Sequence, residues 1–147
     1  MDYCKKLFGK SKEEIDFQLI EKYFHEEREE SVLIEFKSYS LKYGNLNKNL
    51  EGVTRGITAF LNSDGGIIIW GAPEGKKVPD RDEKVFQGAL TPIDERKEKD
   101  WLINKISDSI TPMPVGVGVA ILESDSGYVY IFEIQKSPYS PHQTKQI

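Results

Sequence analysis

Apolar residues recur along the chain with two different periods, and these periods predict its secondary structure. Val32, Ile34 and Phe36 alternate with Leu33, Glu35 and Lys37, so one face is apolar and the other ends in charge, as is typical of a strand covered mainly on one face. Between residues 50 and 61 apolar residues recur every three or four positions, as in an amphipathic helix, and Gly65-Gly66 marks its end. Residues 67–70 are apolar throughout, so we expect them to form a strand inside the sheet.

Similar patterns extend the prediction to both ends of the chain. Ser11 and Glu14 have the spacing of a capping box, which predicts a first helix over residues 12–27. After a polar segment, residues 101–110 show helical spacing, and residues 115–134 alternate as an antiparallel hairpin. The order strand, helix, strand, helix, strand, strand behind an extra N-terminal helix predicts an α+β or mixed α/β fold. We expect two layers, with a mixed sheet and helices on one side.

Length and composition restrict the class of protein. The chain has 147 residues, which suits one domain with one core. Its single cysteine, Cys4, cannot form an internal disulfide, and no run of 18 apolar residues is present to span a bilayer. The first residues lack the apolar stretch of a secretory signal. We therefore expect a cytoplasmic protein without a membrane partner.

The charge of the chain is distributed unevenly. The net charge is −4, and residues 1–35 carry all of that excess, with six Lys or Arg against ten Asp or Glu. Residues 36–147 hold fourteen of each sign and are neutral. A neutral body can carry a local basic stripe that contacts phosphates, or simply a solvated surface of mixed charge.

Two common kinds of site are excluded by the arrangement of residues. In phosphate-binding loops the glycines lie between a strand and the helix that follows, whereas Gly65-Gly66 lies between a helix and the following strand. The helix dipole would therefore point the wrong way. One cysteine and two histidines, His25 and His142, are too few for a structural zinc site.

An ordered set of short motifs resembles the Alba-like domain of the Schlafen family. The set comprises Glu30-Ser31, Glu35-Phe36-Lys37, Ala59-Phe60-Leu61-Asn62, Gly65-Gly66, Gly71, Ser137-Pro138 and Pro141-His142. The resemblance implies a family domain over residues 30–147, preceded by a helical extension over residues 1–29, within a single domain overall. It also implies a module that binds RNA or single-stranded DNA in a regulatory or defence system.

The same resemblance points to three carboxylates. Animal relatives include RNA-cleaving enzymes with three acids, which match Glu30, Glu35 and Glu74 here, although the third is usually an aspartate. This implies that the three are catalytic residues and ligands of Mg²⁺ or Mn²⁺, which favour oxygen and activate water. Positions 30 and 35 would face opposite sides of one continuous strand, so the chain must bend near Glu30-Ser31 for both to reach one metal. A solvated surface position is the alternative for each acid.

Basic and aromatic residues complete the candidate interface. Cationic side chains supply the sequence-independent part of nucleic-acid affinity, and an exposed tyrosine can stack on an unpaired base. The candidates for phosphate or ligand contact are Lys37, Arg55, Lys76, Lys77 and His142, with Lys42, Lys48 and Lys136 as further lysines and Tyr39, Tyr43 and Tyr139 as stacking residues.

Three classes of function therefore stay open. The first is a nucleic-acid-binding module, the second a metal-dependent endoribonuclease, and the third a protein-interaction module without a nucleic-acid role. The partners expected for these are RNA or DNA, or a second copy of the chain in a homodimer. Binding without turnover, Mn²⁺-dependent cleavage of folded RNA, or neither would distinguish them.

Overall fold

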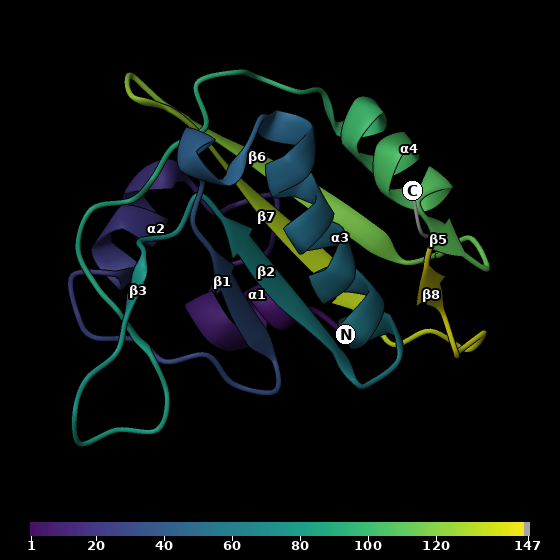
Figure 1. The fold of residues 1–147 in the computed structure, drawn as a ribbon, viewed down its shortest axis with the longest axis horizontal. Coiled ribbons are helices and arrows are strands. Elements are labelled where there is room, and N and C mark those ends of the chain that lie inside the picture. The colour runs from purple at the N-terminus through teal and green to yellow at the C-terminus, as the bar shows by residue number, and fades with distance from the viewer. Residues whose placement is uncertain (146–147) are drawn as a thin grey trace.

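A mixed four-stranded sheet forms the centre of the protein. The computed structural model describes residues 1–145, and its central sheet has the strand order β1-β2-β7-β6 (Figure 1). Strand β2 is buried at every position, β7 is buried over residues 129–132, and only β1 and β2 run parallel. The strands are β1 Ile34–Lys37, β2 Gly65–Trp70, β6 Val117–Ser124 and β7 Gly127–Gln135. The strand expected at residues 67–70 and the hairpin that follows are confirmed, and they share one sheet.

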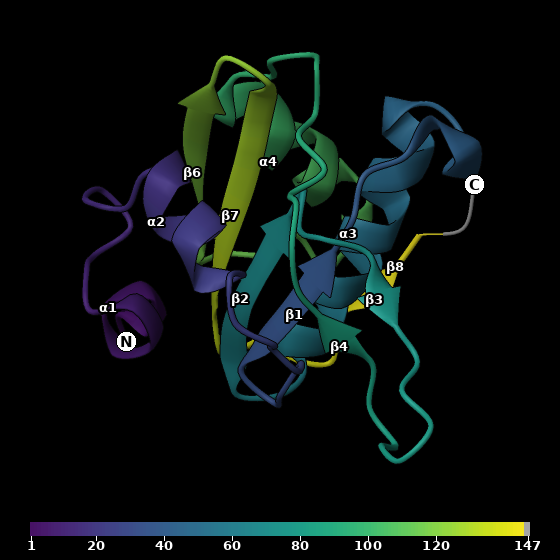
Figure 2. The ribbon, with the colours of Figure 1, turned by 90° about the vertical axis from the view of Figure 1, so that its left-hand side faces the viewer.

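Helices cover both faces of this sheet. On one face lie α3 (Leu46–Leu61) and α4 (Lys99–Asp108), which pack on Ile68 and Trp70. On the other face lie α1 (Tyr3–Phe8) and α2 (Phe17–Tyr23), whose core includes the alternate residues of β2 (Figure 2). The α+β class and the mixed sheet are confirmed. The N-terminal helices add a layer that the two-layer expectation did not contain.

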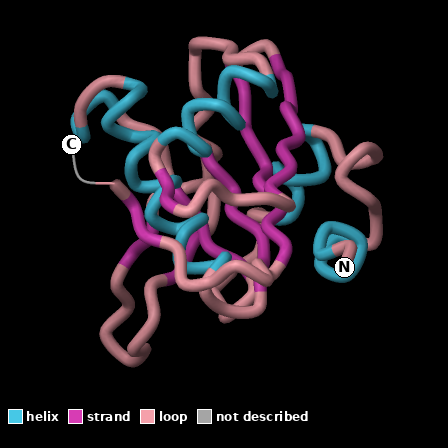
Figure 3. The backbone as a smooth tube through the Cα atoms, turned by 90° about the vertical axis from the view of Figure 1, so that its right-hand side faces the viewer, coloured by secondary structure: helices cyan, strands magenta, loops and turns pink. Residues whose placement is uncertain are grey.

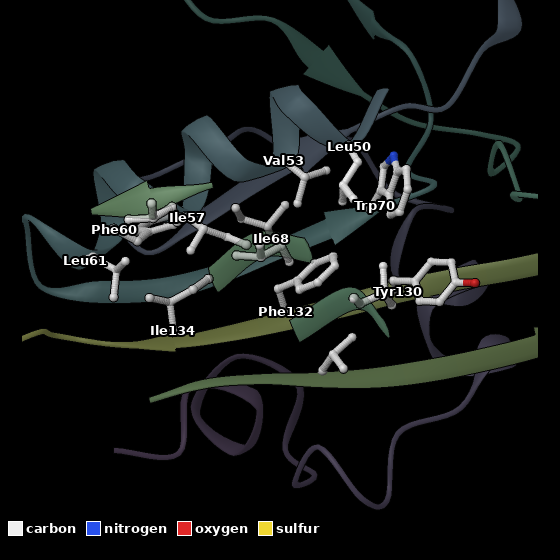
Figure 4. Packing of buried hydrophobic residues seen from close by; sticks show 14 of the residues in the cluster. Leu50, Val53, Ile57, Phe60, Leu61, Ile68, Trp70, Tyr130, Phe132 and Ile134 are labelled. Atoms are coloured by element: carbon white, nitrogen blue, oxygen red, sulfur yellow. The ribbon is translucent and has the colours of Figure 1, made fainter. Parts of the chain in front are cut away.

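The sequence explains where helix α3 begins and ends and which of its sides is buried. The side chain of Asn45 accepts a hydrogen bond from the Lys48 amide and caps the N-terminus. The apolar residues of its inner face point toward the sheet, where they meet Ile68 and Phe132 (Figure 4). After the helix, Gly65 and Gly66 have φ angles of 82° and 153°, which allow the sharp entry into β2. The inner residues are Leu50, Val53, Ile57 and Leu61.

The N-terminal segment differs from the single helix expected over residues 12–27. The amide and hydroxyl of Ser11 both donate to the Glu14 carboxylate, but the Glu14 amide donates to the Ser11 carbonyl and not to its hydroxyl. Only half of the capping box therefore forms, and only a turn follows it. The carboxylate of Asp16 accepts the Leu19 amide at 2.9 Å and starts α2 later. A capping motif satisfies local donors, but it does not by itself provide the packing that sustains a helix.

The polar segment after β2 forms small elements at the edge of the protein. Strands β3 (Gly75–Lys76) and β4 (Val85–Phe86) pair, and the loop between them projects from the body (Figure 3). Strand β5 (Ile110–Thr111) pairs with β8 (Gln143–Thr144) beside α4. The short helix η1 (Leu41–Tyr43) precedes α3. None of the helices formed by residues 1–145 has the length and apolar character that a bilayer crossing requires.

The domain boundary at residue 30 stays a prediction. Residues 146 and 147, which complete the predicted domain, lie outside the described residues.

Candidate functional site

The chain turns back on itself immediately before β1. Ser31 and Ile34 exchange backbone hydrogen bonds of 3.0 and 3.4 Å, and Val32 at the tip of this turn is 84% exposed. The alternating pattern had placed Val32 in the strand, which is wrong because the turn removes it. The turn brings Glu30 alongside β1, where its Oε2 accepts the Phe36 amide at 2.8 Å. This is the bend that Glu30 and Glu35 need in order to share a site.

Glu35 lies in the middle of β1 and points at α3. A Cβ atom at Gly56 of α3 would collide with Oε2 of Glu35, so the carboxylate occupies the space that this glycine leaves. Within residues 1–145 this buried oxygen accepts no hydrogen bond, and the ammonium of Lys37 lies 4.0 Å away. Burial raises the pKa of Glu35, Lys37 partly lowers it, and Glu30 adds a smaller increase.

All three predicted acids line one cleft. We call this the carboxylate cleft; it has a volume of about 450 Å³ and lies between β1, α3 and the β3–β4 pair. Glu74 reaches it from the short segment between β2 and β3, in which residues 71–73 are buried and Glu74 itself is exposed. Among the side chains of residues 1–145, no three or more His, Cys, Asp or Glu lie close enough to hold a metal ion. The acids therefore share a cleft without forming a ligand set in this arrangement, and the Mg²⁺ or Mn²⁺ site stays a prediction.

Three of the predicted cations, Lys37, Lys48 and Arg55, line the same cleft, whereas Lys76 and Lys77 do not. Lys37 extends from the end of β1, and Arg55 extends from α3 beside Gly52, which adds no side chain to this surface. Lys76 and Lys77 lie outside this lining, on β3 and the loop that follows it. The Lys77 ammonium donates to two carbonyls of its own loop, at 3.0 and 3.3 Å.

The structure separates the three candidate stacking residues. Tyr43 lines the carboxylate cleft and is 54% exposed, so its ring is accessible to a ligand. Tyr39 instead packs edge-on against Trp70, with the ring centroids 6.0 Å apart. Tyr139 is exposed but does not line this cleft. Of the three, Tyr43 is therefore the one placed to stack on a base in the cleft.

His142 is buried away from the carboxylate cleft and is only 4% exposed. Its Nδ1 lies 2.8 Å from the Pro112 carbonyl, and its Nε2 lies 2.6 Å from the Ser137 hydroxyl. A carbonyl only accepts, so Nδ1 donates, and in a neutral ring Nε2 accepts from Ser137. The backbone of His142 also exchanges two hydrogen bonds with the Asn62 side chain. These contacts tie the C-terminal segment to the end of α3 and do not support a ligand-binding role.

Sequence reasoning missed several residues of the cleft. Lys84 and Asn49 line it, and neither belongs to a motif. Gly52 and Gly56 lie four residues apart inside α3, where each glycine disfavours the helix by roughly 0.5–1 kcal/mol relative to alanine. Two such glycines on one helix face indicate a close approach of another group. That spacing is the signal from which the close approach of Glu35 to α3 could have been predicted.

Comparison with known proteins identifies the family of the chain. A family model described as Schlafen, AlbA_2 matches residues 30–147. No curated protein matches the chain.

Two solved structures are similar at low identity, each with a TM-score of 0.45. One is the N-terminal domain of a RecG-related protein, named after an ATP-dependent DNA helicase, from Nitrosomonas europaea. It is 15% identical, and the match covers 73% of this chain and 65% of that one. The other is the DIP2311 protein from Corynebacterium diphtheriae, 17% identical, with 76% of this chain and 19% of that chain covered. The chain thus spans less than two thirds of either solved structure.

Proposed function

Because the chain belongs to the Schlafen, AlbA_2 family over residues 30–147, we propose that it is a nucleic-acid-binding module for RNA or single-stranded DNA. The observation that carries the proposal is the convergence of seven sequence-predicted residues on the carboxylate cleft. They come from β1 and its preceding turn, from η1, from α3 and from the segment after β2, and they are Glu30, Glu35, Lys37, Tyr43, Lys48, Arg55 and Glu74.

The cleft combines three kinds of group that a single strand requires. Lys37, Arg55 and Lys84 offer cations to phosphates. The exposed ring of Tyr43 offers a surface on which an unpaired base stacks. The carboxylates repel phosphates and accept hydrogen bonds from amino groups on base edges, so they favour bases over the backbone in their part of the cleft.

The test is a binding titration followed by fluorescence anisotropy with a labelled single-stranded oligonucleotide at several salt concentrations. Replacing Lys37 and Arg55 by alanine should reduce the slope of log affinity against log salt by about 1.4, because each lost phosphate contact removes about 0.7. The matched control is the double alanine variant of the exposed residues Lys10 and Lys22, which lie in the N-terminal helical segment. Absence of binding by the wild type at low salt would overturn the proposal and favour a protein-interaction module.

A metal-dependent endoribonuclease is the second candidate, and the shared cleft of three acids favours it. Glu30 lies near enough to Glu35 to raise its pKa, so these two acids already interact. If this candidate is correct, folded tRNA should be cleaved in the presence of Mn²⁺, and Glu35→Gln should abolish cleavage without loss of folding. Intact tRNA with the wild type and Mn²⁺ would remove this candidate.

A further inference from the structure

A second cleft lies on the other side of α3. It has a volume of about 540 Å³ and is formed by α3, the end of α4 and the segment around β8. We call it the basic cleft because four cationic side chains line it: Lys48, Arg55, Lys105 and Lys145. The only aliphatic side chain in its lining is Leu50, and no aromatic residue of the described chain contributes to it.

The positive charge of the basic cleft is largely uncompensated. Its one carboxylate, Glu51, is already paired with Lys48 at 3.1 Å. Among the described residues, no acidic group lies within 4.0 Å of the cationic atoms of Arg55 or Lys105. Since residues 36–147 are neutral as a whole, this concentration of cations produces a local field that attracts anions.

Hydrogen bonds hold the far wall of the basic cleft in place. The backbone amide of Lys145 donates to the Ser109 carbonyl at 2.8 Å, which joins the end of β8 to the end of α4. The hydroxyls of Thr144 and Thr58 lie 3.0 Å apart and connect β8 to α3. The backbone from which Lys105 and Lys145 extend is therefore fixed relative to α3 before any ligand arrives, which lowers the entropy cost of binding.

The two clefts meet at the outer surface of α3. Lys48 and Arg55 line both of them, and seven residues place these two side chains on one side of the helix, about 10 Å apart along its axis. Gly52 lies between them and adds no side chain to this surface. An extended anionic chain can therefore cross α3 from one cleft to the other while it stays within reach of both cations.

We propose that the basic cleft binds phosphate groups, and that its ligand is the backbone of the strand whose bases occupy the carboxylate cleft. This step rests on the proposed nucleic-acid function. The absence of aromatic residues from the lining favours phosphate over base, because bases are held by stacking. The basic cleft thus supplies affinity independent of sequence, and the carboxylate cleft contacts the bases.

The first test uses the Lys105→Ala, Lys145→Ala double variant and a labelled single-stranded oligonucleotide. The salt slope should fall by about 1.4 relative to wild type. The control is the Lys22→Ala, Lys99→Ala variant, which has the same net charge but changes exposed lysines outside both clefts. If the oligonucleotide binds and the Lys105→Ala, Lys145→Ala variant keeps the wild-type slope, the basic cleft does not bind phosphate. The proposed function would survive that result.

The second test replaces the oligonucleotide by inorganic pyrophosphate and follows backbone amides by NMR. Shifts should concentrate at Lys105, Ser109 and Thr144 in the wild type and should be lost in the double variant, whose other amides report that the fold is intact. If no oligonucleotide binds but these shifts appear, the nucleic-acid function fails and the phosphate site stands. Shifts scattered over all exposed lysines, or no shifts, would overturn the phosphate site.

Discussion

The two sides of α3 differ in how densely they are packed. The inner face fills space: Val53, Ile57 and Leu61 are fully buried against the sheet. The side toward β1 and the clefts leaves space: Gly52 adds no side chain to the surface, the buried Gly56 makes room for the Glu35 carboxylate, and the two clefts open beside them. One side of the helix therefore contributes mainly to stability and the other mainly to binding. The free energy of unfolding should respond differently when a methyl group is added or removed on each side.

The largest effect is expected on the inner face. Ile57 is completely buried between α3 and the sheet (Figure 4). Ile57→Ala should lower the free energy of unfolding by about 2–5 kcal/mol, because it removes apolar contacts and leaves a cavity. Urea denaturation followed by tryptophan fluorescence would measure the change. An unchanged midpoint would show that the inner face is not packed as described.

The next effect comes from filling the space at Gly56. A Cβ atom there would press on the Glu35 carboxylate and come within 2.8 Å of Cδ1 of Ile68. Gly56→Ala should therefore destabilise by roughly 1–3 kcal/mol, as overpacking does. Combining it with Glu35→Ala should recover part of that loss, whereas additive losses in a double-mutant cycle would mean that the two residues do not touch.

Gly52→Ala is the matched control and should act in the opposite direction. The added Cβ would meet only the Arg55 guanidinium, at 3.8 Å, which is an ordinary contact. Replacing a helical glycine by alanine without a clash should stabilise the protein by about 0.5–1 kcal/mol. A rise in melting temperature for this variant beside a fall for Gly56→Ala would confirm the comparison, and equal shifts would contradict it.

The smallest effect concerns the charge on Glu35. Its pKa is raised in the folded state, chiefly by burial, so the fold is favoured while this carboxyl keeps its proton. That stability is fully present below the unfolded pKa and is lost as the pH rises through the higher folded pKa. Glu35→Gln cannot ionise, so it should be slightly more stable than wild type at pH 7 and equal to it in acid. Thermal melts at several pH values would measure this, and a gain that does not depend on pH would exclude ionisation as its cause.

The spacing of apolar residues correctly predicted those elements whose formation depends on packing in the core. The buried strand β2, helices α3 and α4 and the β6–β7 hairpin all follow from apolar spacing, which reflects the shape of the core directly. The N-terminal helices were placed less well. The Ser11–Glu14 motif is a local signal, whereas the start of α2 depends on where Phe17 and Ile20 meet the sheet. Tertiary packing therefore decided what the local motif could not.

The site could be predicted only in part. The family motifs named Glu30, Glu35 and Lys37, which lie close together in the sequence, and they named Glu74 from its place just after the buried strand β2. Lys105 and Lys145 come from segments that only the folded chain brings together beside α3, so no spacing indicates them. The contacts of His142 with Pro112 and Ser137 likewise depend on how the C-terminal segment returns to the body.

Because Arg55 belongs to both clefts, the two clefts are thermodynamically linked even if no atom moves. A ligand that holds the Arg55 guanidinium in one cleft would withdraw part of its charge from the other, so the affinity of each cleft would depend on what the other holds. Linkage is reciprocal, so the two effects would be equal in free energy. The helix would then act as one binding surface and not as two independent sites.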